Sequence, residues 1–390
     1  MNDVNINQFT PSFIPRIFDN SLYNKFDNIP IAFFEAHHIE HLSGVYLNNI
    51  EKIKFLIIDP VTHILNYKEA REKPSFKKLP YSFDMDIQKL YSEFNYRNDN
   101  LIKPSIEYQI SKQSNIIISP YLFAYHVDDL IFSTNLTMLK ESIDYINNNN
   151  YKIPLFAVIT LNCHTLEQPN TINYVLNRYL EFNKILDGFL IIINDLDCKK
   201  GNPSQIFGLA KMVNFLSQYN NVLLKQVGSI GDILIAIGAI GNMSGLDTGE
   251  KFSLKNLESS SGRIHPRIFI PELFNYINDQ KAIEIKYKCK CSYCNNTLPK
   301  TSLDKKIHFY TSKIELNNKL KRLNQIQKID FMINEIKNSE EFSNRILGYD
   351  TNYLKNWRNI LELSKTWEFT KQDEINLIEL LKDLDKGNND

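Results

Sequence analysis

The run Gly188-Phe189-Leu190-Ile191-Ile192-Ile193-Asn194 decides the fold class of this chain. All of its internal side chains are apolar, without the polar and apolar alternation of a strand that has one face in water. A strand of this kind is covered on both faces, as in a parallel sheet. Further runs, each bounded by turn or polar residues, bring the total to eight: Pro30–Ala36, Phe55–Asp59, Asn115–Phe123, Pro154–Leu161, Asn221–Val227, Ile237–Gly245 and Arg267–Ile270.

Segments with helical spacing of apolar residues separate most of these runs. They are Leu139–Asn147, Thr171–Ile185, Ser204–Tyr219 and Gly231–Ile237. Alternating strands and helices are typical of βα units, and a count of eight favours a (β/α)8 TIM barrel. An open doubly wound sheet is the structural alternative.

The positions at which this alternation of strands and helices begins, is interrupted and ends divide the chain into segments. We interpret residues 1–28 as an irregular lead-in, 29–285 as the barrel, and 60–114 as an insertion on its rim with a helix near Tyr81–Asn95. Residues 286–310 form a zinc-binding loop, and 311–390 an α-helical C-terminal region. Helices are predicted around Ile314–Ile336, Tyr353–Leu363 and Gln372–Leu384.

Composition is that of a folded globular protein without a strong overall charge. The 390 residues include 45 basic and 45 acidic side chains, so only a local basic face could attract nucleic acid. The most apolar run, Ile230–Met243, is too short and too rich in glycine to cross a bilayer. No secretory signal opens the chain, and its five cysteines suit a reducing compartment, so we expect a cytoplasmic protein away from membranes.

A metal site is predicted by Cys289-Lys290-Cys291-Ser292-Tyr293-Cys294 and the downstream His308. Three thiols within six residues, followed by an imidazole, suit a tetrahedral Cys3His zinc ion. A disulfide is a poor alternative for an odd cluster in a chain of this size, and incidental cysteines in a basic loop are another. A closed site with four protein ligands is structural, so zinc would clamp the loop.

Reacting groups of a (β/α)8 barrel lie at the carboxyl ends of its strands. The candidates there are Asp59, Asn194, Asp195, Gln226, Gly228, Asp247 and Glu250. Each has a plainer interpretation: Asp59 precedes Pro60 and suits a turn, while Asn194 and Asp195 suit a helix cap. His37, His38 and His41 could form a second metal site, but spacing fixes no carboxylate partner, which favours a role in loop packing.

Four stretches resemble the tRNA-guanine transglycosylase family, zinc-containing (β/α)8 barrels of the queuosine and archaeosine type, with DNA-modifying relatives. They are Cys289-x-Cys291-x-x-Cys294 with a downstream histidine, Leu186-Asp187-Gly188-Phe189, Leu224-x-x-Val227-Gly228-Ser229-x-x-Asp232, and Phe55-x-x-x-Asp59. Members exchange guanine in a nucleic acid for a 7-deazaguanine base. The resemblance implies a pentosyltransferase that acts on tRNA or DNA.

For base exchange, the resemblance implies two catalytic carboxylates. They would lie about 5 Å apart, as in a retaining glycosidase. Asp59 would move the proton and Asp247 would attack the sugar, while the base would meet Asn194, Asp195, Gln226, Gly228 and Glu250. The chain also departs from the pattern. Pro60-Val61-Thr62 replaces Ser-Gly-Gly, and Gly245 stands where the nucleophile is expected, so Asp247 serves only if its loop is shifted.

Asp59 and the nearby Asp247 favour the enzyme, which is the leading interpretation. The glycine at position 245 favours a second class of function, a non-catalytic zinc-containing barrel subunit that binds nucleic acid or a catalytic partner, as a homodimer or a heterodimer. A metabolic enzyme with a glycine-rich phosphate loop is a more distant alternative. Lysines around the zinc loop could meet phosphates or simply face solvent: Lys286, Lys288, Lys290, Lys300, Lys305 and Lys306.

Overall fold

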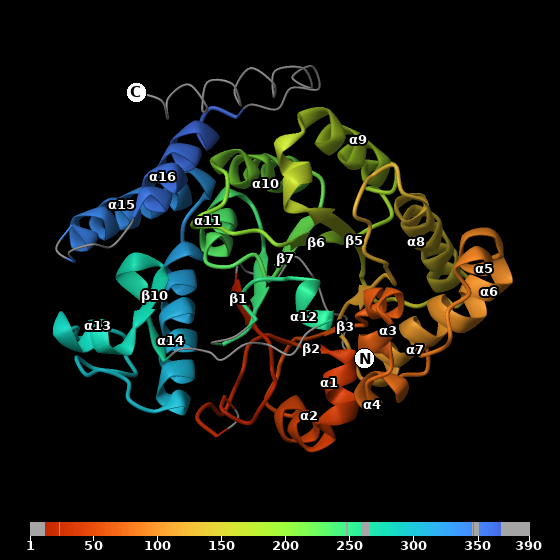
Figure 1. Ribbon diagram of the computed structural model, residues 1–390, viewed down its shortest axis with the longest axis horizontal. Coiled ribbons are helices and arrows are strands. Elements are labelled where there is room, and N and C mark those ends of the chain that lie inside the picture. Colours follow the sequence, from red (N-terminus) through yellow and green to blue (C-terminus); the bar gives the residue numbers. More distant parts are fainter. Residues whose placement is uncertain are drawn as a thin grey trace.

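The computed structural model describes residues 12–22, 24–246, 249–258, 266–344, 346 and 351–367. Its centre is a curled parallel sheet of six strands in the order β1-β8-β7-β6-β5-β4, surrounded by helices (Figure 1). The strands are β1 Ser12–Pro15, β4 Ile117–Ile118, β5 Leu155–Asn162, β6 Gly188–Asn194, β7 Asn221–Lys225 and β8 Gly241–Ser244. All residues of β6 are buried, as its apolar sequence predicts.

A second parallel pair, β2 (Ala32–Glu35) and β3 (Leu56–Asp59), lies between the two edges of this sheet. Isolated parallel bridges connect it to both sides. Arg16 pairs with Phe33 next to β1, and Ile57 pairs with Ile116 next to β4. The carboxyl ends of β1, β2 and β3 therefore lie on the same side as those of the six-stranded sheet.

Helices follow most strands and cover the sheet. Those that precede β9 are α1 Ala36–His41, α2 Ser43–Ile50, α3 Lys68–Arg71, α4 Pro74–Lys77, α5 Ile87–Ser92, α6 Phe94–Arg97, α7 Lys103–Ser111, α8 Leu130–Asn148, α9 Pro169–Leu180, α10 Pro203–Leu216, α11 Ile230–Ile237 and α12 Lys255–Glu258. The segment after β3, residues 60–114, predicted as an insertion with one helix near Tyr81–Asn95, contains the five helices α3 to α7 instead.

Two sequence predictions about the strands were wrong. Arg267–Ile270 (β9) pairs antiparallel with β10 (Asn275–Asn278), so it is not a strand of the parallel sheet. Its place is taken by β1, inside the segment interpreted as an irregular lead-in. With four residues, of which two are serine and proline, β1 is too short to show a period. It is nevertheless buried along its whole length and pairs with β8 from Ser12 to Pro15.

Glycine in the seventh apolar run has a packing reason. A Cβ atom on Gly241 would lie 2.5 Å from Ile14 Cδ1 and 2.8 Å from Leu223 Cδ2, both closer than carbon atoms approach one another. A larger residue at position 241 would therefore require the side chains of Ile14 and Leu223 to shift. Strand β8 is shorter than the predicted run Ile237–Gly245. It covers only Gly241–Ser244, and Ile237 is the last residue of α11.

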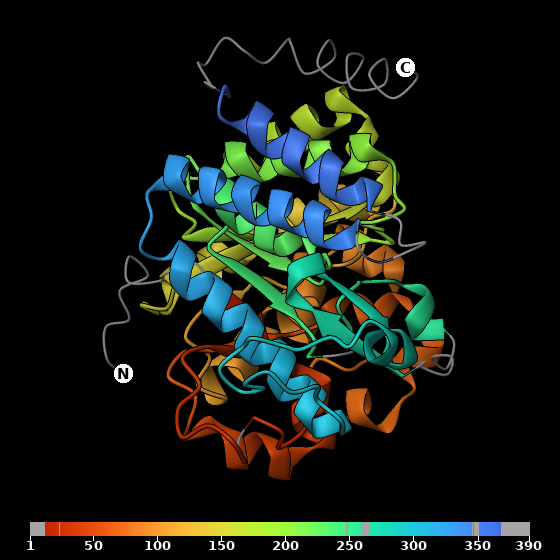
Figure 2. The same cartoon turned by 90° about the vertical axis from the view of Figure 1, so that its left-hand side faces the viewer.

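The described residues from Ser302 onward are mostly helical, as predicted, and pack on the sheet and its helices (Figure 2). α13 is Asp279–Glu284, α14 Ser302–Leu320, α15 Gln325–Ser343 and α16 Asn352–Ser364. α14 contacts β1 and β9, and α15 and α16 contact α11. The helix predicted at Gln372–Leu384 lies outside the described residues.

Candidate metal centre and strand-end cluster

Cys289, Cys291, Cys294 and His308 converge on one point, and all four are buried. Their sulfur atoms lie 3.3, 3.5 and 3.4 Å from His308 Nδ1. Tetrahedral zinc with ordinary bond lengths places sulfur and nitrogen ligands about 3.6 Å apart. The four predicted ligands are therefore brought together with the spacing that zinc requires.

A second contact orients the imidazole of His308. Its Nε2 lies 2.7 Å from the carbonyl oxygen of Phe269, and a hydrogen bond there fixes the tautomer that leaves Nδ1 free for a metal. His308 belongs to α14, Phe269 to β9, and the cysteines to the loop between α13 and α14. A zinc ion would hold these three segments together, which is the chemistry of a structural site with no open position.

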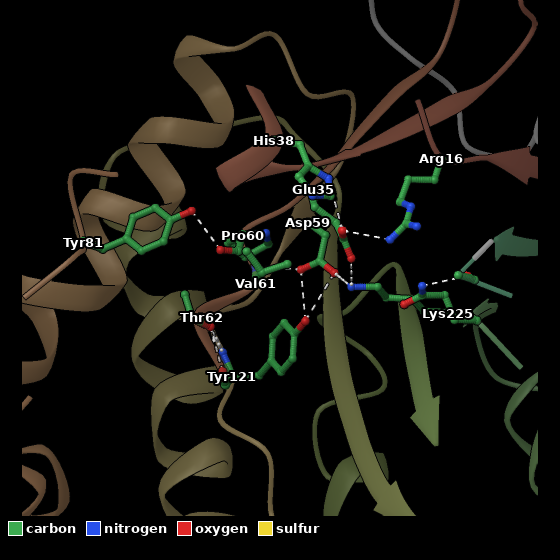
Figure 3. A network of polar contacts seen from close by, with 12 residues as sticks. Arg16, Glu35, His38, Asp59, Pro60, Val61, Thr62, Tyr81, Tyr121 and Lys225 are labelled. Carbon is green, nitrogen blue, oxygen red and sulfur yellow. Dashed lines mark hydrogen bonds and ion pairs between the residues drawn. The ribbon is translucent and has the colours of Figure 1, made fainter. Parts of the chain in front are cut away.

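A second group of polar side chains, the strand-end cluster, comprises Arg16, Glu35, Asp59, Tyr121 and Lys225 (Figure 3). Lys225 ends β7 and is fully buried, with Nζ 2.5 Å from Asp59 Oδ2 and 3.0 Å from Glu35 Oε1. Arg16 Nη1 lies 3.1 Å from Glu35 Oε2. Because β7 is not a neighbour of β2 or β3, these ion pairs cross the interior of the curled sheet.

Charge balance keeps the cluster ionised. Burial by itself lowers the pKa of Lys225, but the carboxylates of Asp59 and Glu35 outweigh it and raise this pKa above its ordinary value. Burial raises the pKa of Glu35, while Lys225 and Arg16 bring it well below its ordinary value. A lysine held protonated in this way is an ion-pair partner and not an amine nucleophile.

Both oxygens of the Asp59 carboxylate already accept hydrogen bonds. Its Oδ1 accepts from the backbone N–H of Val61 at 2.8 Å and from the Tyr121 hydroxyl at 3.0 Å. Its Oδ2 accepts from Lys225 at 2.5 Å and lies 3.2 Å from the same hydroxyl. The side chain is fully buried. Asp59 thus lies at a strand end, as predicted, with three hydrogen-bond donors around its buried carboxylate.

Phe252 covers the cluster. Its ring centroid lies 5.8 Å from Lys225 Nζ, is stacked 5.9 Å from the ring of Phe123, and meets the imidazole of His63 edge-on at 5.5 Å. Phe252 is 7% exposed. Burial, together with the charge of Lys225, lowers the pKa of His63 well below its ordinary value, so this imidazole is neutral. The rings exclude water from the ion pairs.

The predicted base-binding residues Asn194, Asp195 and Gln226 lie together, but each is bound to residues 249–254. Asn194 Oδ1 accepts from the backbone N–H of Leu254 at 2.9 Å. The backbone N–H of Asp195 donates to the Phe252 carbonyl at 3.0 Å. Gln226 Nε2 donates to the Gly249 carbonyl at 2.7 Å. These residues therefore hold the segment that carries Phe252 against the strand ends.

Gly228 and Glu250 belong to the same arrangement. The backbone N–H of Gly228 donates to the Glu250 carbonyl at 2.8 Å, and Gly228 has a φ of 76°, which favours glycine. The Glu250 carboxylate accepts from the Tyr276 hydroxyl at 3.0 Å, and burial raises its pKa. Asp247, the predicted nucleophile, lies outside the described residues.

A cavity of about 330 Å³ lies beside the zinc loop and not at the strand ends. Its lining mixes charges, with Lys290 and Lys319 facing Glu272 and Glu335, and Phe274 supplies an apolar wall.

Sequence reasoning assigned no role to Lys225, Glu35, Arg16 or Phe252. The sequence does contain a sign of the ion pairs, because a charged residue directly follows a buried apolar run in two places. Lys225 follows Val222–Leu224, and Glu35 follows Ala32–Phe34. A charge at the carboxyl end of a fully buried strand requires a partner, although the sequence does not name it.

No protein-family model matches this chain, and no curated protein matches it. Among solved structures, it is similar to the carboxyl transferase domain of Rhizobium etli pyruvate carboxylase with 3-bromopyruvate, with a TM-score of 0.34 and 11% sequence identity. The match covers 80% of this chain and 48% of that one, so this chain spans about half the length of its neighbour. Likeness at this level supports no argument about function. None of the helices in the described ranges is both long and apolar enough to cross a bilayer.

Proposed function

We propose that this protein is a non-catalytic (β/α)8 barrel of the transglycosylase type, which binds nucleic acid through its zinc loop. The bridges from Arg16 to Phe33 and from Ile57 to Ile116 support a closed barrel, because they join the β2–β3 pair to both edges of the six-stranded sheet. The zinc motif and the strand-end sequence stretches support the family resemblance.

One observation carries the non-catalytic assignment. Lys225 reaches from β7 to Asp59 on β3 through the space where a base and its sugar would have to enter, and Phe252 covers it. Asp59, the proton carrier that the resemblance implies, accepts hydrogen bonds from Lys225, Tyr121 and Val61. A substrate would have to displace a buried ion pair, which costs several kcal/mol.

The nucleic-acid surface is proposed on the zinc loop. Lys286, Lys288, Lys290 and Lys300 are exposed, and none of them forms an ion pair with another described residue. Lys305 and Lys306 are instead paired with Asp279 and Asp19, which removes them from the predicted phosphate-binding set. Four free ammonium groups on a loop clamped by zinc can follow a phosphate backbone without further ordering of the chain.

Binding of fluorescent tRNA and of duplex DNA, measured by anisotropy at several salt concentrations, tests this proposal. The quadruple Lys→Gln variant at residues 286, 288, 290 and 300 should bind at least about tenfold more weakly, with a shallower salt dependence. A matched variant with Lys68, Lys77, Lys140 and Lys184 changed to Gln, away from the loop, should bind like the wild type. Equal binding by both variants, or no binding by the wild type, would exclude the zinc loop as the surface.

An active base-exchanging enzyme is the second candidate. It is favoured by Asp59 at the end of β3 and by Asn194, Asp195 and Gln226 on neighbouring strands, in the order that the resemblance implies. A covalent adduct with nucleic acid that survives denaturation, and that Asp247→Ala abolishes, would support this candidate over the binding role.

A further inference from the structure

The junction of β2 and α1 brings one carboxylate and two imidazoles together. Glu35 is the last residue of β2, and His37 and His38 lie in the first turn of α1. Each residue offers a ligand atom, and these atoms all lie within 4.8 Å of one another. In the part of the chain that the structure describes, the only other cluster of this kind is the Cys3His centre. The sequence showed the histidines but not their carboxylate partner.

One ring nitrogen of each histidine in this cluster lacks a hydrogen-bond partner. Nδ1 of His37 and Nδ1 of His38 are both buried and form no hydrogen bond. Nδ1 of His38 lies 3.3 Å from Glu35 Oε2, without the geometry of a hydrogen bond. The two rings are close, with centroids 4.0 Å apart. Buried polar atoms without partners are uncommon, and each costs about 1–3 kcal/mol.

A small cation would satisfy these atoms where water could not. The buried nitrogens have almost no surface for a water molecule, whereas a metal ion lies between ligand atoms at 2.0–2.2 Å, as in the zinc sites of other proteins. We propose that Glu35, His37 and His38 bind a first-row divalent transition-metal ion, with Zn²⁺ as the best-suited ion, at a second site separate from the Cys3His centre.

The donor set decides the class of ion. Two imidazole nitrogens and one carboxylate suit zinc and its neighbours, while magnesium and calcium prefer oxygen ligands. Three protein ligands leave at least one open position for water or an anion. This is the arrangement of exchangeable metal sites and differs from the closed Cys3His centre.

Neighbouring charges set the expected strength. Glu35 also contacts Lys225 through Oε1 and Arg16 through Oε2, so a divalent ion shares its carboxylate with two cations. Arg16, Glu35, Asp59 and Lys225 together are neutral, and the ion's charge is offset only by an anionic ligand in the open position. We therefore expect weaker binding than at the Cys3His centre, and earlier loss to a mild chelator.

Metal counting on the full-length protein tests the site. After saturation with zinc and gel filtration, the wild type should retain about two zinc ions per chain, one closed and one open site. His38→Asn should retain one fewer. His41→Asn is the matched control, because His41 is exposed on the same helix and outside the cluster, and it should retain the wild-type number. Retention of about one ion by the wild type, and of the same number by His38→Asn, would overturn the proposal.

Cobalt titration of the wild type is a second test, which does not depend on whether a variant folds. The first equivalent should fill the Cys3His centre and give strong thiolate-to-cobalt absorption bands. A second saturable equivalent should change the weak ligand-field bands without adding thiolate bands, and Glu35→Gln should remove it. A single equivalent that accounts for all cobalt bound would also overturn the proposal. Nucleic-acid binding does not enter either measurement, so this proposal and the proposed function fail separately.

Discussion

Lys225 Nζ lies 2.5 Å from Asp59 Oδ2, although the two residues come from β7 and β3 and are 166 positions apart in the chain. Both side chains are fully buried, and Glu35 shares the ammonium group. The pair therefore links opposite parts of the curled sheet where a barrel enzyme would hold its substrate. The same contact supplies the buried Asp59 carboxylate with a cationic partner at its strand end.

Replacing Lys225 tests this link directly. Lys225→Met keeps an unbranched side chain but removes the ammonium group, and leaves Asp59 and Glu35 as buried carboxylates without their shared cation. We expect the free energy of unfolding in urea to fall by about 3–5 kcal/mol, because breaking one side of a buried pair leaves an uncompensated charge. Lys288→Met, on the exposed zinc loop, should change it by less than about 0.5 kcal/mol. A loss below about 1 kcal/mol for Lys225→Met would show that the pair contributes little.

His63 should make stability depend on pH. Its folded pKa is well below its ordinary value through burial, while the unfolded chain binds a proton near pH 6.5. Below that pH the unfolded state binds more protons, so stability falls as pH drops from about 7 toward the folded pKa, by at most about 1.4 kcal/mol per pH unit. His63→Phe keeps a ring between Tyr121 and Phe252 and should make this slope shallower without abolishing it, because burial also lowers the pKa of His37 to about 3 and that of His38 to about 4. Parallel pH profiles for the two proteins would exclude His63 as the source.

The Cys3His centre should contribute folding energy. Cys291→Ser removes one thiolate, and we expect the variant to lose one zinc equivalent relative to the wild type and to melt at a lower temperature. Metal analysis and a thermal scan measure both effects. Cys163→Ser is the matched control, because Cys163 is also buried but lies outside the metal cluster. An unchanged zinc content in Cys291→Ser would remove the site.

The zinc ligands were predictable from sequence because their pattern is local. Three cysteines lie within six residues and a histidine follows them, although the zinc loop was predicted to extend to residue 310, whereas α14 already begins at Ser302 and contains His308. Fully apolar runs such as Gly188–Asn194 were equally clear as buried parallel strands, and the structure confirms that strand. β1 was not predicted, because four residues are too few to show a periodic pattern of apolar side chains. β9 was assigned to the parallel sheet wrongly, because a short apolar run does not show whether its partner strand is parallel or antiparallel.

The strand-end cluster depends on contacts that no local pattern carries. Lys225 was visible as a charge in a buried run, but only the fold places it against Asp59 and Glu35. The amides of Asn194 and Gln226 looked suited to reading a base, yet their hydrogen bonds go to Leu254 and Gly249. Sequence thus located polar groups at strand ends correctly, and could not tell whether they face a substrate or another segment of the chain.

Phe252 gives the sharpest test of whether the strand ends are closed. Phe252→Ala removes the ring over Lys225, His63 and Phe123, and the loss of a buried aromatic side chain should cost about 3–5 kcal/mol in urea unfolding. Water would then reach the ion pairs, so hydrogen exchange at the backbone amides of residues 57–61 and 222–226 should accelerate relative to the wild type. Phe94→Ala, at a ring that is 53% exposed, should leave both measurements nearly unchanged. If exchange at these strand ends is already fast in the wild type and insensitive to Phe252→Ala, the segment that carries Phe252 does not close the strand ends in solution, and the main argument against an entering base is lost.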